Sequence, residues 1–175
     1  MRHALAVLAS LAGLACAGWT SGTHVGYQVN DQSTTGFRQT GGSLGFLDVA
    51  QAVTDGVEIG VRTLGQGGRL PDRQFYRLGA GPLAVVQVGD GWSLQGSVQA
   101  FQESGLKPDG SKLYDSRGTD FMLGWEKAYQ LAPRADVAWG GFVTRYQGGV
   151  SSAAGVASKN AGMAHGLEAA LKVQL

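Results

Sequence analysis

The sequence predicts an all-β fold of eight antiparallel strands that close into an up-and-down barrel. Three observations lead to this fold class. Apolar and polar residues alternate with a period of two, short and long connectors alternate along the chain, and only 15% of the residues are charged. An ordinary soluble domain carries about 25% charged residues. Alternation with a period of two indicates strands with one apolar and one polar face.

Eight segments of the chain are expected to form these strands. In the first of them, Val25 and Tyr27 lie on the apolar face, and His24 and Gln28 lie on the polar face. The segments are residues 23–29, 37–53, 56–64, 75–88, 92–100, 120–131, 136–144 and 166–175.

Two of the expected strands break the alternation. In 37–53, a bulge near Phe46 and Leu47 would restore the phase. In 75–88, Pro82 lacks a backbone donor, so it requires either a bulge or a position without a ladder hydrogen bond.

The last segment, GLEAALKVQL, is also a run of good helix formers. However, Leu167, Leu171 and Val173 alternate with Glu168 and Lys172. We therefore expect the closing strand of the barrel, paired with the first strand.

The connectors predict two different ends of the barrel. The short ones are 54–56, 89–91 and 132–134, and the long polar ones lie around 30–36, 65–73, 103–118 and 147–161. An even strand number, with short turns on one side and long loops on the other, is typical of outer-membrane barrels.

The polar face is expected to line the inside of the barrel. A soluble eight-stranded barrel has an apolar interior, but here the apolar faces carry almost no charge and therefore suit lipid. Closure is then required, because lipid cannot satisfy an open sheet edge. The sequence thus predicts a transmembrane barrel, and Lys127 is expected to snorkel to the headgroups.

Charged residues on the polar faces predict an ion-pair network in the lumen. Arg62 is expected to contact Glu126, Glu168 or both, because buried charges require partners. Glycines such as Gly60 would leave room for these long side chains. The predicted network comprises Glu58, Arg62, Arg77, Asp120, Glu126, Glu168 and Lys172.

Aromatic residues are expected at both membrane interfaces, where amphipathic rings are favoured. Trp19, Trp92 and Tyr129 would lie near the short-turn end of the barrel. Tyr27 and Tyr76 would lie toward the opposite rim.

Residues 1–17 have the pattern of a cleavable signal peptide, which leaves a single barrel domain over 18–175. A basic start precedes a short apolar core and a small-x-small site around Cys16. Lipidation of Cys16 is the alternative. Cleavage removes the only cysteine and one arginine, so 14 − 1 = 13 basic residues remain against 13 acidic ones. A near-neutral chain without a basic cluster does not fit a nucleic-acid partner.

The whole layout resembles the small OmpA-like and OmpX-like eight-stranded outer-membrane barrels, over essentially all of 18–175. The resemblance implies a porin-like barrel in the Gram-negative cell envelope, surrounded by outer-membrane lipids. It also implies recognition by the barrel-assembly machinery, which in that family reads a terminal strand that usually ends in an aromatic residue. This chain ends in Leu175. We expect a monomer.

The leading functional hypothesis is a non-enzymatic barrel with a structural or surface-interaction role and with no cofactor, metal or catalytic residue. One alternative is a lipid-modifying enzyme of the lipid A deacylase type, but His165 and Glu168 are three residues apart and should face opposite sides of their strand. The other alternative is a soluble periplasmic barrel that binds a small ligand.

Overall fold

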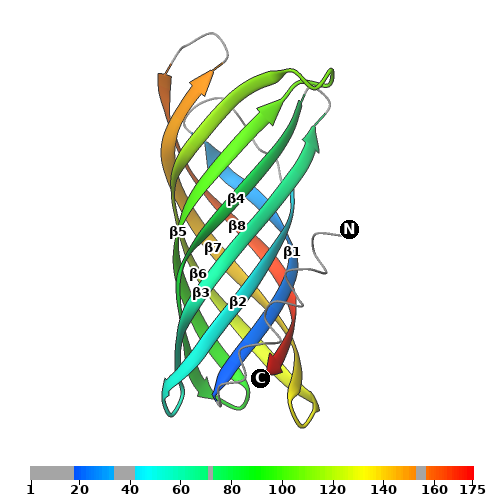
Figure 1. Cartoon of the computed structure of the whole chain (residues 1–175), viewed down its shortest axis with the longest axis vertical. Helices are drawn as coiled ribbons and strands as arrows, with labels where there is room; N and C mark the ends of the chain where they lie inside the picture. Colours follow the sequence, from blue (N-terminus) through cyan, green and yellow to red (C-terminus); the bar gives the residue numbers. More distant parts are fainter. Residues whose placement is uncertain (1–17, 34–41, 71–72, 153–156) are drawn as a thin grey trace.

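The computed structural model describes residues 18–33, 42–70, 73–152 and 157–175, which form one closed antiparallel barrel (Figure 1). The predicted fold class is confirmed. The strands are β1 (Trp19–Ser33), β2 (Gly42–Thr54), β3 (Val57–Leu70), β4 (Arg73–Gly89), β5 (Trp92–Leu106), β6 (Lys112–Ala132), β7 (Ala135–Ser152) and β8 (Ala157–Gln174).

The predicted signal peptide, residues 1–17, lies outside the described residues and stays a prediction, as does the fate of Cys16. Within the described part of the chain, no helix has the length and apolar character needed to cross a membrane.

The barrel closes where β1 pairs with β8, from Thr20 opposite Gln174 to Ser33 opposite Gly162. The segment GLEAALKVQL is therefore the closing strand, and tertiary pairing overrides its helix propensity. Each strand hydrogen-bonds to two neighbours, so the sheet has no open edge.

Three two-residue turns lie at the same end of the barrel as the start of β1 and the end of β8 (Figure 1). We call this the short-turn end. In the turn between β4 and β5, Asp90 has φ 51° and Gly91 has φ 74°. Two successive positive φ values are what a type I′ hairpin requires, and Asp-Gly is a favoured pair for it.

We call the opposite end of the barrel the loop end. Its connectors differ from those expected. Most residues of 65–73, 103–118 and 147–161 belong to strands, so the strands are longer and the loops shorter than expected. β6 alone has 21 residues, whereas about 9–11 residues cross a bilayer. The barrel wall therefore continues beyond the membrane at this end.

The turn between β5 and β6 shows how compact a loop at this end is. Lys107 N donates to Ser111 O at 2.8 Å, which closes a five-residue connection. The Asp109 carboxylate accepts hydrogen bonds from the hydroxyl (2.6 Å) and backbone N–H (2.8 Å) of Ser111. These bonds hold the pKa of Asp109 below its usual range.

The expected bulge near Phe46 is wrong. The register of β2 against β3 runs without a shift from Ser43 to Ala52. Leu44 and Phe46 point into the barrel and are buried, so part of the inner face of β2 is apolar. The phase looked broken in the sequence because this inner face changes from apolar to polar at Asp48.

β4 also keeps its phase through Pro82. Its register against β5 is the same before and after the proline, at Ala80 opposite Ala100 and Leu83 opposite Ser97. Pro82 itself has no partner on β5, which is the second of the two arrangements expected for it.

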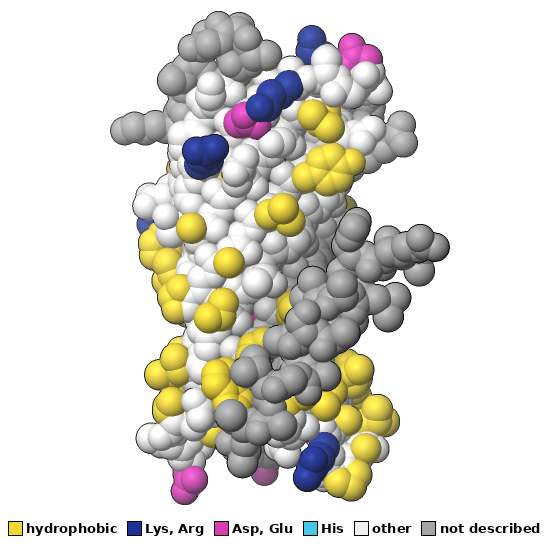
Figure 2. All heavy atoms as spheres, in the orientation of Figure 1, with side chains coloured by type: hydrophobic (Ala, Val, Ile, Leu, Met, Phe, Trp, Pro, Cys, Tyr) yellow, Lys and Arg dark blue, Asp and Glu magenta, His cyan; other side chains and the backbone are white. Residues whose placement is uncertain are grey.

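Large apolar side chains cover the outside of the barrel. Figure 2 shows hydrophobic surface between two ends where charged side chains gather. Such an exterior with a charged interior contradicts the soluble-barrel alternative and matches a barrel that spans lipid. Prominent outward residues are Val25, Ile59, Leu78, Leu123, Leu131 and Leu167.

An arginine scan of β6 tests this placement. Leu123 and Leu131 are equally exposed, at 69%, but Leu131 lies beside the short turn and Leu123 lies further along the wall. Leu123→Arg should destabilise the barrel by roughly 2–4 kcal/mol and Leu131→Arg by about 0–1 kcal/mol, because the cost of a cation depends on depth in lipid. Urea unfolding in lipid vesicles measures both values. Equal tolerance of the two arginines would contradict a lipid-facing exterior.

Candidate functional site

The lumen is filled by two layers of charged and polar side chains with an apolar layer between them. The lower charged layer, nearer the short-turn end, consists of His24, Asp48, Arg62, Gln95, Glu126, Glu168 and Lys172. The upper charged layer consists of Arg77, Glu103, Tyr114, Asp120 and Thr144.

Arg62 anchors the lower charged layer. Its side chain is fully buried. It donates two hydrogen bonds to the Asp48 carboxylate, from Nε to Oδ1 at 2.8 Å and from Nη2 to Oδ2 at 2.5 Å. The guanidinium also lies over the Phe46 ring, 4.7 Å from its centroid. A bidentate, charge-assisted pair of this kind holds both side chains in one geometry.

Gln95 connects Arg62 to Glu168. Arg62 Nη2 donates to Gln95 Oε1 at 2.5 Å, and Gln95 Nε2 donates to Glu168 Oε1 at 2.5 Å. Glu126 forms its ion pair with Lys172. The contacts expected from Arg62 to Glu126 or Glu168 are thus replaced by a direct pair with Asp48, which the sequence analysis did not include.

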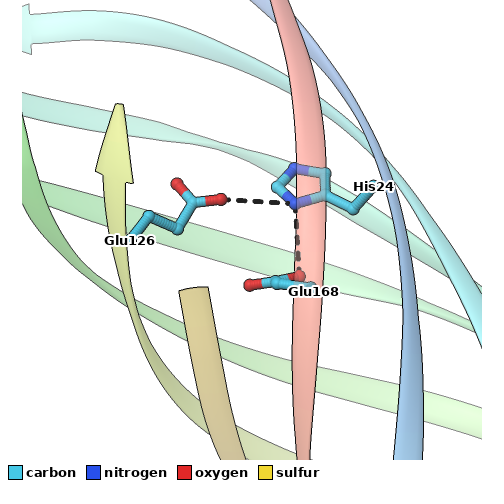
Figure 3. Close-up of side chains that lie close together, drawn as sticks. All are labelled: His24, Glu126 and Glu168. Carbon is cyan, nitrogen blue, oxygen red and sulfur yellow. Dashed lines mark ion pairs between the residues drawn. The ribbon is translucent and has the colours of Figure 1, made fainter. Parts of the chain in front are cut away.

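His24 lies at the centre of the lower charged layer. Its Nε2 faces Asp48 Oδ2 at 2.9 Å, and its Nδ1 faces Glu126 Oε1 at 3.3 Å and Glu168 Oε2 at 3.2 Å (Figure 3). The imidazole comes from β1 and the two glutamates come from β6 and β8. Three carboxylates surround a ring that is 1% exposed.

The fixed charges of this layer do not balance. Asp48, Glu126 and Glu168 supply three negative charges, whereas Arg62 and Lys172 supply two positive ones. One additional positive charge at the imidazole would make the layer neutral. Buried charge without a partner costs several kcal/mol, so this position favours a cationic species.

Glycines make the close approach of the two glutamates possible. Gly140 lies between them in the sheet, opposite Glu126 on one side and Glu168 on the other. A Cβ at Gly140 would lie 2.1 Å from Trp125 O, so no side chain fits there.

Gly60 is equally restricted. A Cβ at this position would lie 2.1 Å from the carbonyl oxygen of Val49 and 2.5 Å from Cα of Ala50. The glycine therefore serves contact between neighbouring backbones as well as space for side chains in the lumen.

The upper charged layer is built around Arg77. Arg77 Nε donates to Glu103 Oε2 at 2.8 Å, and Nη1 donates to Asp120 Oδ2 at 3.3 Å. The guanidinium lies over the rings of Phe101 and Tyr146, at 4.4 and 4.9 Å from their centroids. Arg77 thus points into the lumen, as expected.

A mainly apolar layer lies between the two charged layers, and Ser97 and Gln99 of β5 are buried polar residues at the same level of the wall. On β6, Met122 lies between Glu126 below and Asp120 above, and on β3, Leu64 follows Arg62 toward the loop end. The buried cluster consists of Leu44, Phe46, Leu64, Met122 and Phe142.

Of the predicted network, only Glu58 is not in an ion pair within the described residues. It is half-buried at the short-turn end and accepts a hydrogen bond from Thr20 Oγ1 at 2.8 Å. Glu103 was not predicted, because the sequence pattern placed it in a loop. His24 and Asp48 were not predicted either, although the alternation of the first strand places His24 on the polar face.

Four of the five predicted interfacial aromatics are exposed on the outer wall, and near the short turns they belong to a larger cluster than expected. Tyr27 and Tyr76 are exposed on the outside, Trp92 and Tyr129 lie on the outer wall near the short turns, and Trp19 is half-buried at the start of β1. Their interfacial role stays a prediction.

Three tryptophans on adjacent strands form that cluster. The ring centroids of Trp92, Trp125 and Trp139 are 5.3–6.3 Å apart. Lys127 lies 5.4 Å from the Trp92 ring centroid and donates to the backbone carbonyl of Asp90 in the short turn. Its ammonium group thus reaches the short-turn end, as snorkelling predicts.

No family model matches this sequence, and no curated protein matches it either. Among solved structures, Neisserial surface protein A (NspA) superimposes with a TM-score of 0.60 at 14% identity, covering 91% of this chain and 98% of NspA. The chain has the fold of a small outer-membrane barrel. The predicted architecture and outer-membrane type are therefore confirmed.

Two further structures are more distant. The β domain of the Bordetella autotransporter BrkA has a TM-score of 0.42 at 10% identity, covering 90% of this chain and 99% of that domain. The Escherichia coli outer-membrane protease OmpT has a TM-score of 0.39 at 10% identity, covering 90% and 94%. Neither likeness says anything about the function of this outer-membrane barrel.

The pair between Arg62 and Asp48 can be tested by a double-mutant cycle. Arg62→Gln should cost roughly 3–5 kcal/mol of unfolding free energy, because it leaves a buried carboxylate without its cation. The variant that carries both Arg62→Gln and Asp48→Asn should lose less unfolding free energy than the two single variants lose together, by about 0.5–3 kcal/mol. Urea unfolding in lipid vesicles measures all three variants. Arg117→Gln, on the exposed outer wall, is the control, and strict additivity would show that the pair is not coupled.

Proposed function

We propose that this outer-membrane barrel is non-enzymatic, has a sealed lumen, and acts through the part of its wall that projects beyond the membrane at the loop end. The observation that carries the proposal is the stack of three layers across the lumen. Buried ion pairs hold each charged layer together, and a mainly apolar layer lies between them.

The layers explain why a conducting pore is not favoured. Eight strands leave an interior only just wide enough for side chains. An ion in transit would have to displace side chains such as Phe46, Met122 and Phe142, which pack between the two charged clusters. It would lose its hydration there without gaining a charged partner.

The loop end supports a surface role. The strands continue past the apolar band, and their outward residues become charged, as at Arg117 and Arg145. In outer-membrane barrels the short turns face the periplasm and the longer connections face the exterior. This orientation would present a rigid, charged rim at the cell surface.

The lipid-modifying alternative would need His165 and Glu168 to act together. His165 is exposed on the outer wall, whereas Glu168 is buried in the lumen. The two side chains lie on opposite sides of the sheet, as their spacing of three residues requires. They cannot act together on one substrate.

Conductance measurements test the sealed lumen. The purified barrel in a planar bilayer should show no steady current above that of the bare membrane, because the apolar layer blocks the path. A sixteen-stranded porin in the same membrane serves as the positive control. A stable, ohmic open state of the wild-type barrel would contradict the proposal.

Surface accessibility tests the orientation. An epitope inserted between Asp109 and Gly110 should bind antibody on intact cells, because this turn lies at the loop end. The same epitope between Asp90 and Gly91 should bind only after the outer membrane is permeabilised. Labelling of the second site alone on intact cells would reverse the proposed orientation.

A further inference from the structure

We propose that His24, Glu126 and Glu168 form a binding site for one divalent transition-metal ion of the zinc type inside the lumen. The site belongs to the lower charged layer and does not depend on the proposed role of the loop end. It rests on two features: the spacing of the ligand atoms and the contacts that surround them.

The distances from His24 Nδ1 to the two carboxylate oxygens match those between the ligand atoms of a tetrahedral site. His24 Nδ1 lies 3.3 Å from Glu126 Oε1 and 3.2 Å from Glu168 Oε2 (Figure 3). One donor atom from each residue lies within 4.8 Å of the other two. An ion that binds tetrahedrally at about 2.0 Å keeps its ligand atoms about 3.3 Å apart.

Each ligand is oriented by a contact on its far side. His24 Nε2 faces Asp48 Oδ2 at 2.9 Å, Glu168 Oε1 accepts from Gln95 at 2.5 Å, and Glu126 Oε2 pairs with Lys172. A carboxylate opposite one imidazole nitrogen favours a proton there, which leaves the other nitrogen free to bind a metal. The pairing of Asp48 with His24 is therefore the arrangement that prepares Nδ1 as a ligand.

The near-side atoms contact only one another. Among the described residues, His24 Nδ1, Glu126 Oε1 and Glu168 Oε2 make no hydrogen bond, and neither does His24 Nε2, although it faces Asp48. All three residues are at least nine-tenths buried. A single proton on Nδ1 could be donated to only one of the two carboxylates at a time. A metal ion binds both carboxylates and the imidazole together.

The donor set favours zinc over a harder ion. Imidazole with carboxylates suits Zn²⁺, whereas Ca²⁺ requires six to eight oxygen ligands. Zn²⁺ would also bring two positive charges to a layer in which three carboxylates face only Arg62 and Lys172, so the layer would change from a net charge of −1 to +1.

The short-turn end opens toward His24. A cavity of about 20 Å³ borders His24, Asp48 and Lys172. It shares Thr20, Glu58 and Lys172 with a wider opening of about 250 Å³ at the barrel mouth. Neither glutamate ligand lines this cavity, so an ion that enters here must pass the partly exposed Lys172 and the imidazole to reach them.

Calorimetric titration of the chelator-treated, folded full-length barrel with Zn²⁺ tests the proposal. The wild type should bind one ion per barrel, and its Tm should rise with Zn²⁺ and fall again on addition of EDTA. Glu168→Gln and His24→Gln should each weaken binding by roughly 100-fold or more, because even changes in outer contacts cost about 10–100-fold.

Two matched variants locate the ion. Glu103→Gln, which changes a carboxylate of the upper charged layer, should leave Zn²⁺ binding unchanged, and so should His165→Ala on the outer wall. Because a variant of a buried ligand can fail to fold, the wild type loaded with Co²⁺ provides a second measurement, an intense visible absorption band of tetrahedral coordination. Absence of stoichiometric Zn²⁺ binding by the wild type would overturn the site, as would binding that is lost only in His165→Ala.

Discussion

The structure depends on one constraint, which is that lipid offers no hydrogen-bond partner to the backbone. Every N–H and C=O group of a strand in the membrane must therefore pair with a neighbouring strand. Pairing of β1 with β8 satisfies this requirement because it removes the last open edge. Closure in turn divides each strand into a lipid face and a lumen face, and an eight-stranded lumen is so narrow that its side chains must pack against one another.

The charged lumen follows from this division and is stabilised by pairing within each layer. Arg62 and Arg77 are fully buried, but each has a carboxylate partner and an aromatic ring beside its guanidinium. A well-packed apolar interior could be equally stable, since desolvation of charges offsets much of their attraction. What the ion pairs add is a fixed geometry, which positions His24 between two glutamates.

Sequence alternation predicted the barrel, its eight strands and its closing strand, because the face of a residue within a strand is a local property. It was less informative where the lumen itself is apolar. Leu44 and Phe46 looked out of phase because an apolar residue that faces lipid and one that faces the core have the same chemistry. Long strands at the loop end were also missed, because polar residues in an extended wall resemble those of a loop.

The members of the candidate site were largely predictable, but their partners were not. Parity placed Arg62, Glu126 and Glu168 inside, whereas their contacts depend on how far each strand is shifted relative to its neighbours. That stagger is a property of the whole barrel and leaves no trace in any one strand. It inserts Gln95 between Arg62 and Glu168. Asp48 and Arg62, in contrast, lie directly opposite each other in the hairpin of β2 and β3, so their pairing follows from the register of that hairpin.

The seam between β1 and β8 has a consequence for the order of assembly. Its pairs join residues from the two ends of the strand sequence, such as Thr20 with Gln174, so their formation carries the largest loop-closure entropy in the sheet. His24 lies on one side of the seam, and both Glu168 and Lys172 lie on the other. The contact of His24 with Glu168 can therefore form only when the cylinder is complete. This contact therefore adds no stability to hairpins that form early, and it slows the unfolding of the closed barrel.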